Sequence, residues 1–427
     1  MTLSWIQIAR LGLVQMALGA IVVLTTSTLN RLMVVEFALP AVLPGALVGL
    51  HYGIQLSRPK WGYTSDTGGK RTAWIIGGMA GLALGGFVAA FAVTLFETMF
   101  WTAIALSICA YAAIGLGVGA SGTSLLALLA TATAPRRRAA AATITWLMMI
   151  LGIALTAGLA GGFLDPYSPG RLLAVVGTVV IAAFVLTVVA VAGIERKVIA
   201  KRAPDPTPFL EGLREVWSEP RTRNFTLFVF LSMNAYFMQE MILEPFAGLV
   251  WEFTPGQSTT LSGAQNGGVF VGMLTIGILA TGLKIGTLRG WVIAGCLGSA
   301  ASLVCIALSA KTLTAFGLTP LVIGLGFFNG MFAVATISAM MALAAEGREQ
   351  REGTRMGLWG AAQAIAAGFG GLTGAAAVDV MRQFQPDGAA FGAVFTLEAA
   401  LFIASAFMAL HIMQPARGTN PAMVPGE

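Results

Sequence analysis

The chain has 427 residues, of which 57% are hydrophobic and only 10% are charged. Soluble globular proteins carry about 25% charged residues, so the composition excludes a soluble, disordered or nucleic-acid-binding protein. Apolar runs of about 20 residues recur along the whole chain and predict an integral membrane protein made of helices rather than β-strands. The formal net charge of +6 therefore concerns topology, because basic residues of such proteins gather on the cytoplasmic side.

The apolar segments predict an all-α protein with twelve transmembrane helices. With these helices in place, 21 of the 25 Lys and Arg residues fall on one side of the membrane. A split this uneven predicts an even number of spans with both termini in the cytoplasm. In chain order, the predicted helices cover residues 9–35, 39–57, 73–95, 100–132, 139–163, 171–194, 222–250, 259–282, 290–310, 317–345, 356–381 and 390–414.

An internal repeat divides the chain into two similar halves. A basic loop precedes Trp146, and a second basic loop precedes Trp359, 213 positions later. Between the halves lies the longest polar stretch, which is rich in proline and ends in an amphipathic segment at 209–218. We therefore predict an N-terminal six-helix bundle at 1–194, a cytoplasmic linker with a short interfacial helix at 195–221, and a C-terminal six-helix bundle with a short cytoplasmic tail at 222–427.

The loop between the second and third predicted helices contains a motif. It has the spacing Gly, three residues, Asp, one residue, Gly, one residue and two basic residues, which is similar to the signature of the major facilitator superfamily. The resemblance implies the major facilitator fold, with two pseudo-symmetric halves of six helices, and a role of this loop in gating. The motif residues are Gly62, Asp66, Gly68, Lys70 and Arg71.

Ionisable residues inside the predicted helices are costly in lipid and often functional. The repeat aligns Arg31 of the first helix with Glu240 of the seventh, and the first helices of each half line the central cavity of this fold. We expect a buried Arg31–Glu240 ion pair across the pseudo-twofold axis, with Glu244 on the same helical face as Glu240. The alternative places Arg31, Glu36 and Glu244 at the outer interface, in contact with water.

Other polar residues within the helices have more than one interpretation. Glu398 and Asp379 could line a pathway or cap a helix end, and His51 could be a metal ligand or a hydrogen-bonded packing residue. We find neither a P-loop nor a nucleophile–histidine–acid set on one face, so we predict that the protein is not an enzyme. The protein alone is predicted to hold no metal.

Four segments resemble one branch of this superfamily. They are Arg58–Gly62, Asn30–Glu36, Gln239–Gly248 and Gly357–Gly368, and they are similar to the PucC/LhaA family, the bacteriochlorophyll delivery branch of phototrophic bacteria. The resemblance implies a multi-pass protein of the bacterial inner membrane, either cytoplasmic or intracytoplasmic and photosynthetic. It also implies delivery of bacteriochlorophyll from its synthase to antenna polypeptides and assistance in light-harvesting complex assembly.

The resemblance implies bacteriochlorophyll or a late precursor as the ligand. The implied partners are bacteriochlorophyll synthase, light-harvesting polypeptides or both, together with membrane lipids and without nucleic acid. Two alternatives stay open, namely a proton-coupled secondary transporter or exporter of a small molecule and a non-transporting assembly scaffold. The candidate residues for binding pigment or substrate are Asn30, Arg31, Glu36, His51, Gln239, Glu240, Glu244 and Gln363.

Overall fold

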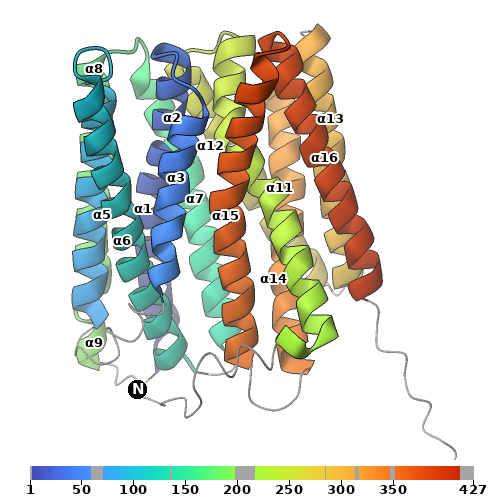
Figure 1. Ribbon diagram of the computed structural model, residues 1–427. Helices are drawn as coiled ribbons and strands as arrows, with labels where there is room; N and C mark the ends of the chain where they lie inside the picture. Colours follow the sequence, from blue (N-terminus) through green and yellow to red (C-terminus); the bar gives the residue numbers. More distant parts are fainter. Residues whose placement is uncertain are drawn as a thin grey trace, which may run out of the picture.

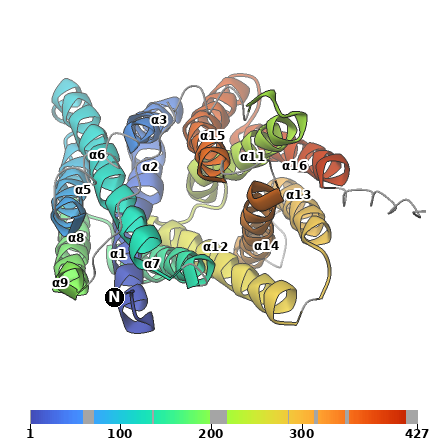
Figure 2. The ribbon, with the colours of Figure 1, turned by 90° about the horizontal axis from the view of Figure 1, so that it is seen from below.

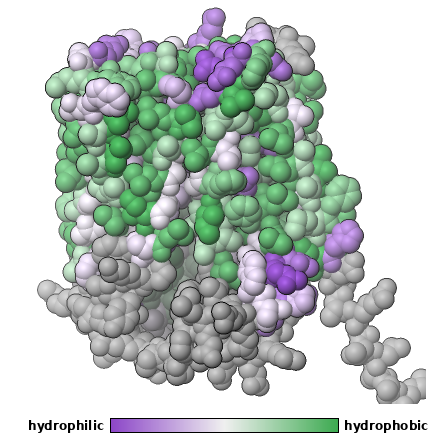
Figure 3. Space-filling view, viewed as in Figure 1, coloured by the Kyte–Doolittle hydropathy of each residue, from purple (hydrophilic) through white to green (hydrophobic). Residues whose placement is uncertain are grey.

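The computed structural model describes residues 2–58, 71–134, 137–197, 217–283, 285–312, 317–346 and 352–413. Within these ranges the regular secondary structure is entirely helical, and the long helices run side by side along one axis (Figure 1). Eleven of the described helices are long and apolar enough to cross a membrane. Figure 3 shows hydrophobic surface over the middle of the bundle and hydrophilic residues at its upper end. The chain is a multi-pass membrane protein.

The first half begins with a long helix in which α-helical and π-helical segments alternate. The segment α1 (Trp5–Val23) continues through η1 (Leu24–Thr28), α2 (Leu29–Arg31) and η2 (Leu32–Glu36), where η1 and η2 are π-helical. The other elements of this half are α3 (Val42–Ile54) with the 3-10 turn η3 (Gln55–Ser57), α5 (Arg71–Val93), α6 (Phe100–Ala132), α7 (Arg138–Leu164), α8 (Pro169–Val191) and the short α9 (Ile194–Lys197).

The second half repeats this order. Its elements are α11 (Pro220–Val250), α12 (Pro255–Ile276) with the π-helical η5 (Gly277–Gly282), α13 (Leu288–Thr312), α14 (Leu318–Glu346), α15 (Glu352–Arg382) and α16 (Asp387–Ile412). Helices α11, α12 and α16 all begin at or beside a proline, which is favourable at a helix start because its missing N–H would have no partner there. Both halves thus consist of six helices in the expected order.

Helix α3 differs from its predicted length. The sequence predicts a span over residues 39–57, but α3 has 13 residues and is followed by the three-residue turn η3. It begins only after Pro40, because the proline ring disfavours helical geometry in the residue before it. The eleven spanning helices together with α3 match the twelve predicted segments one for one.

The two halves meet along two pairs of helices, α7 with α12 and α3 with α15 (Figure 2). Both seams are built from small residues. A Cβ atom on Gly263 of α12 would lie 2.5 Å from the backbone nitrogen of Gly158 of α7, so only glycine permits this approach. Gly49 and Gly368 also face each other between α3 and α15, where a Cβ atom on Gly49 would lie 3.7 Å from the carbonyl oxygen of Gly368. Small residues allow helices to pack closely in lipid, where the hydrophobic effect does not drive helix association.

Most of the predicted gating motif, Gly62 through Lys70, lies outside the described residues, as does most of the predicted linker. Arg71 lies within the described residues and is buried at the start of α5. Its guanidinium donates to the carbonyl oxygen of Ala127 at 3.0 Å and to Thr131, which ties α5 to α6. Glu195 of α9 accepts the backbone N–H groups of Arg71 and Thr72, both at 2.9 Å, and so caps α5.

Candidate functional site

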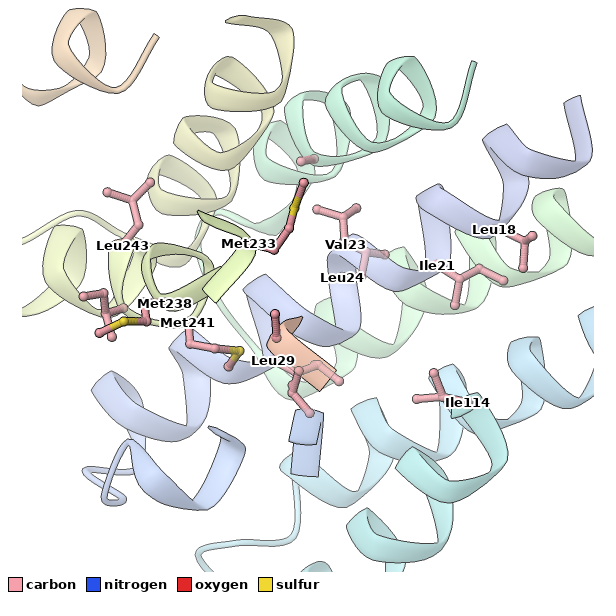
Figure 4. Packing of buried hydrophobic residues seen from close by; sticks show 14 of the residues in the cluster. Leu18, Ile21, Val23, Leu24, Leu29, Ile114, Met233, Met238, Met241 and Leu243 are labelled. Atoms are coloured by element: carbon pink, nitrogen blue, oxygen red, sulfur yellow. The ribbon is translucent and has the colours of Figure 1, made fainter. Parts of the chain in front are cut away.

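A cavity of about 410 Å³ lies between the two halves and is lined mainly by apolar side chains. The first half lines it with residues of α1, η1, α3, α6 and α7, and the second half with residues of α11, α12, α14 and α15. Figure 4 shows four of the apolar lining residues, Leu18 and Val23 on α1 with Met233 and Leu243 on α11. A central cavity shared by both halves is the default ligand site of this architecture.

Two carboxyl groups of α11 line the cavity one helical turn apart. Glu240 is half-buried and borders the cavity, where it interacts with Thr26 of η1. Glu244 is 2% exposed, and neither of its oxygens has a hydrogen-bond partner among the described residues. The neighbouring Gln239 also lines the cavity and is 1% exposed, with its carbonyl oxygen unpartnered. Glu240 is therefore the carboxyl group that a ligand in the cavity can reach.

Arg31 does not form the expected ion pair with Glu240. Its guanidinium instead pairs with Glu36 and donates to the carbonyl oxygen of Phe253 at 2.7 Å, beyond the end of α11. The physical reason is the π-helical segment η2, whose i to i+5 register stacks residues five positions apart. The Glu36 side chain is 35% exposed, as the alternative interpretation expects, but Arg31 and Glu244 are buried and do not reach water at the outer interface.

The remaining predicted residue of the first helix also lies away from the cavity lining. Asn30 is fully buried and donates from Nδ2 to the carbonyl oxygen of Met241 at 2.7 Å. Of the eight candidate residues, the cavity brings together His51, Gln239, Glu240, Glu244 and Gln363. Asn30 and Arg31 instead hold the first helix against the second half, and Glu36 pairs with Arg31.

His51 stands at the end of a hydrogen-bonded relay along α3 and η3. Arg58 donates to the Oε1 atom of Gln55, and an arginine can only donate. The amide nitrogen of Gln55 must therefore face His51, where it lies 2.8 Å from Nε2. Nε2 then accepts this hydrogen bond and the proton resides on Nδ1, so neither ring nitrogen of this 1% exposed side chain offers a free lone pair to a metal.

Aromatic side chains flank Glu240 on the cavity wall. The ring of Phe237 lies 5.7 Å from that of Tyr52 on α3 and 5.1 Å from that of Tyr236, in both cases edge to face. All three rings line the cavity. Across from them, Gln363 of α15 donates Nε2 to the sulfur of Met233 at 3.7 Å. The wall combines flat apolar faces with a small number of polar atoms, the composition typical of a small-molecule site.

Polar contacts between the halves close the cavity at its upper end. Thr28 of η1 shares a hydrogen bond of 3.1 Å with Thr259 of α12, and both side chains are buried. Ser262 donates to Ser27 at 3.3 Å. These contacts lie beside the Asn30 and Arg31 hydrogen bonds to the second half, so the roof of the cavity joins η1 and α2 to α11 and α12.

Two aspartates form a reciprocal pair of helix caps between the halves, here called the interhalf caps. Asp165, at the end of α7, accepts the hydroxyl of Thr254 and the backbone N–H of Gly256 at 3.1 Å, at the start of α12. Asp379 of α15 accepts the backbone N–H of Ala41 at 2.9 Å and that of Val42 at 2.7 Å, at the start of α3. Each half thus caps a helix of the other.

Sequence reasoning treated Asp379 as a cap or a pathway residue and did not single out Asp165. A signal was present, because the two aspartates lie 214 positions apart, close to the 213 positions that separate Trp146 from Trp359. Equivalent acidic residues at the ends of equivalent helices are the pattern that reveals the interhalf caps. No group of three or more His, Cys, Asp or Glu residues able to hold a metal ion occurs within the described part of the chain.

Solved structures with the same architecture are transporters. The fold is similar to the crystal structure of the nucleoside transporter NupG, with a TM-score of 0.67 over 96% of this chain and 98% of that chain, at 12% sequence identity. It is also similar to a bacterial homologue of the human lysosomal transporter Spinster in an inward-facing and unoccupied conformation, with a TM-score of 0.63 over 96% and 95% of the two chains, at 14% identity. The predicted major facilitator fold is confirmed.

The sequence is similar to bacterial proteins along nearly its whole length. A protein of Rhodobacter capsulatus named "Bacteriochlorophyll synthase 44.5 kDa chain" is 65% identical, with complete coverage of both chains. Protein PucC of Cereibacter sphaeroides is 30% identical over 96% of this chain and 92% of its own. The first of these names contradicts our prediction that the protein is not an enzyme, because it points to an enzyme-associated role. The prediction rested on the absence of catalytic motifs from the sequence, and this absence does not exclude an enzyme-associated role.

The family is established along nearly the whole chain. The sequence profile described as "PUCC protein" matches residues 28–417, which include the interhalf caps and all cavity-lining residues except those of α1 and η1. The full-length relatives agree with this match. The chain therefore belongs to the PucC family, as the resemblance of its first, seventh and eleventh helices predicts.

Proposed function

We propose that this protein holds bacteriochlorophyll, or a late precursor, in its central cavity and delivers it from bacteriochlorophyll synthase to light-harvesting polypeptides. The proposal rests on the 65% identity, over the full length, to a protein that is named a chain of bacteriochlorophyll synthase. An esterified tetrapyrrole is too apolar to cross the cytoplasm freely, so its transfer calls for a carrier in the membrane. The corresponding location is the bacterial inner membrane, cytoplasmic or intracytoplasmic.

The cavity supports this proposal through its chemistry. Its apolar lining matches the macrocycle and its hydrocarbon tail, and the aromatic rings of Tyr52 and Phe237 offer flat contact surfaces. Polar groups from both halves interrupt this lining, among them Glu240, Gln363 and the cationic Arg58. An apolar pocket with a few polar groups that fix orientation is what a large, mostly hydrophobic pigment needs.

Purification from a phototrophic host tests the proposal. We expect the protein, extracted in mild detergent, to carry the absorbance of a bacteriochlorin and to co-purify with the synthase or with antenna polypeptides, as identified by mass spectrometry. Ala364→Trp should fill the cavity and remove the pigment, because Ala364 lines it. Ile365→Trp is the matched control, since this neighbour on α15 is 49% exposed on the outer surface. Pigment that persists in Ala364→Trp would contradict binding in the cavity.

A second candidate is a proton-coupled transporter of a small molecule. It is favoured by Glu240 and Glu244, which form no ion pair with any basic side chain of the described ranges. It predicts colourless protein and substrate uptake into proteoliposomes that depends on a proton gradient and is lost in Glu240→Gln. A scaffold without transport predicts instead a stable complex with its partner that changes at Glu240 do not affect.

A further inference from the structure

We infer that Glu240 supplies the oxygen ligand to the central magnesium of the bound pigment, an assignment that rests on the proposed function. The magnesium of such a pigment would accept a further ligand from the protein or from water. Mg²⁺ is a hard cation and prefers oxygen, carboxylates above all. The structure decides which of the polar groups around the cavity can provide this ligand.

Accessibility separates Glu240 from its neighbours on α11. Glu244 and Gln239 are 2% and 1% exposed, and their unpartnered oxygens are covered by protein. Glu240 is half-buried and borders the cavity, so its side chain is more exposed to the space that a ligand would occupy than those of its two neighbours. The position of the accessible carboxyl group therefore points to Glu240.

The obvious nitrogen ligand, His51, is engaged elsewhere. The relay from Arg58 through Gln55 places a donor on Nε2 and the ring proton on Nδ1. A metal requires a free lone pair on imidazole, so His51 could bind magnesium only if this relay broke. The relay instead links α3 to the turn η3 that follows it.

The surroundings of Glu240 fit an approaching macrocycle. Tyr52, Tyr236 and Phe237 line the same part of the cavity, with ring centroids of neighbouring pairs 5.1 Å and 5.7 Å apart. No basic side chain of the described residues pairs with Glu240, so its charge is not neutralised by the protein. Coordination to the magnesium of the pigment would give this carboxylate the Lewis-acid partner that the protein does not supply.

The test compares bacteriochlorophyll a with its magnesium-free counterpart. Binding of each to purified protein in detergent micelles is measured by tryptophan fluorescence quenching and by the shift of the pigment absorbance. Wild-type protein should prefer the magnesium form, and Glu240→Leu should reduce affinity for that form by about 10-fold or more while leaving the magnesium-free form unaffected. Glu240→Gln keeps an oxygen and should retain part of the preference. His51→Phe tests the rival nitrogen ligand, and Ile365→Trp on the exposed face of α15 is the control that should keep all of the preference.

The outcomes separate the two proposals. If wild-type protein binds both pigments equally, or if Glu240→Leu keeps the preference for magnesium, the ligand assignment is overturned while pigment binding stands. Loss of the preference in His51→Phe but not in Glu240→Leu would assign the ligand to His51 instead. If wild-type protein binds neither pigment, the proposed function itself fails. Should Glu240→Leu not fold, as judged by size-exclusion chromatography, Glu240→Gln gives the same comparison with a smaller expected change.

Discussion

The interhalf caps should hold the upper end of the bundle closed. Replacing Asp379 by Asn removes the negative charge from two backbone hydrogen bonds of 2.9 Å and 2.7 Å at the start of α3. Ala41, the N-cap residue of α3, has no side chain that could substitute for it. Asn keeps one acceptor oxygen, so the variant loses only the charge at the helix start, which costs about 0.3–1 kcal/mol. This energy is lost only where the halves touch, so the equilibrium between open and closed upper ends should shift about 2- to 5-fold toward open.

Pulsed electron paramagnetic resonance can measure this shift. Spin labels at Gly170→Cys and Gln385→Cys report the distance between the halves, because both positions are exposed at the upper end and a Cβ on Gly170 meets no atom within 4 Å. The exposed native cysteines, Cys109 and Cys305, are first replaced by Ala. We expect Asp379→Asn to increase the population at the longer distance.

A matched control lies at the same end of the molecule. Asp387 pairs with Arg382 at 2.8 Å within the second half, so Asp387→Asn removes the same charge without touching the contact between halves. Asp165→Asn should act like Asp379→Asn, since its carboxylate caps α12 from the first half. If both variants give the same distance distribution as Asp387→Asn, the interhalf caps do not contribute to closure and the reasoning fails.

Two further predictions concern the same contacts. Gly256→Ala should weaken the α7–α12 seam, because its Cβ would lie 2.4 Å from both the Asp165 carboxylate and a backbone oxygen. Gly162→Ala is the control and should be neutral, because its Cβ would meet no atom within 4 Å. Thermal unfolding in detergent compares the two variants, and equal melting temperatures would contradict the close packing. Double-mutant cycles on the free energy of unfolding should give a coupling of about 0.5–1 kcal/mol for Arg31 with Glu36 and near zero for Arg31 with Glu240. A larger coupling for Arg31 with Glu240 would instead support the ion pair expected from the repeat.

Hydropathy and the sorting of charges were sufficient to predict the twelve segments and the fold, because both follow from the cost of placing polar groups in lipid. The partner of Arg31 could not be predicted in the same way. Its contact with Glu36 depends on the π-helical register of η2, which the 3.6-residue period of an ordinary helix does not reveal. The closed upper end is also invisible in the sequence, since open and closed states share the same residues.

The state of His51 lies between these cases. The spacing from His51 to Gln55 and from Gln55 to Arg58 is four and then three residues, which places the three side chains on one helical face. The relay could therefore have been predicted from the sequence, and with it the direction of the Gln55 amide. The accessibility of Glu240 relative to Glu244 could not, because both lie on one face of α11 and only the packing of α12 and η1 distinguishes them.

The interhalf caps also bear on how the protein is made. The first turn of α3 enters the membrane early in synthesis, but the carboxylate that accepts its N–H groups belongs to a residue 338 positions after Ala41. Until α15 is inserted, those N–H groups have no partner from Asp379, and the end of α3 is free to fray. The start of α12 is different, because its capping residue, Asp165, precedes it in the chain and is already in place when α12 emerges. Completion of the upper end is thus a late event in assembly, and it takes place only after nearly the whole chain is in the membrane.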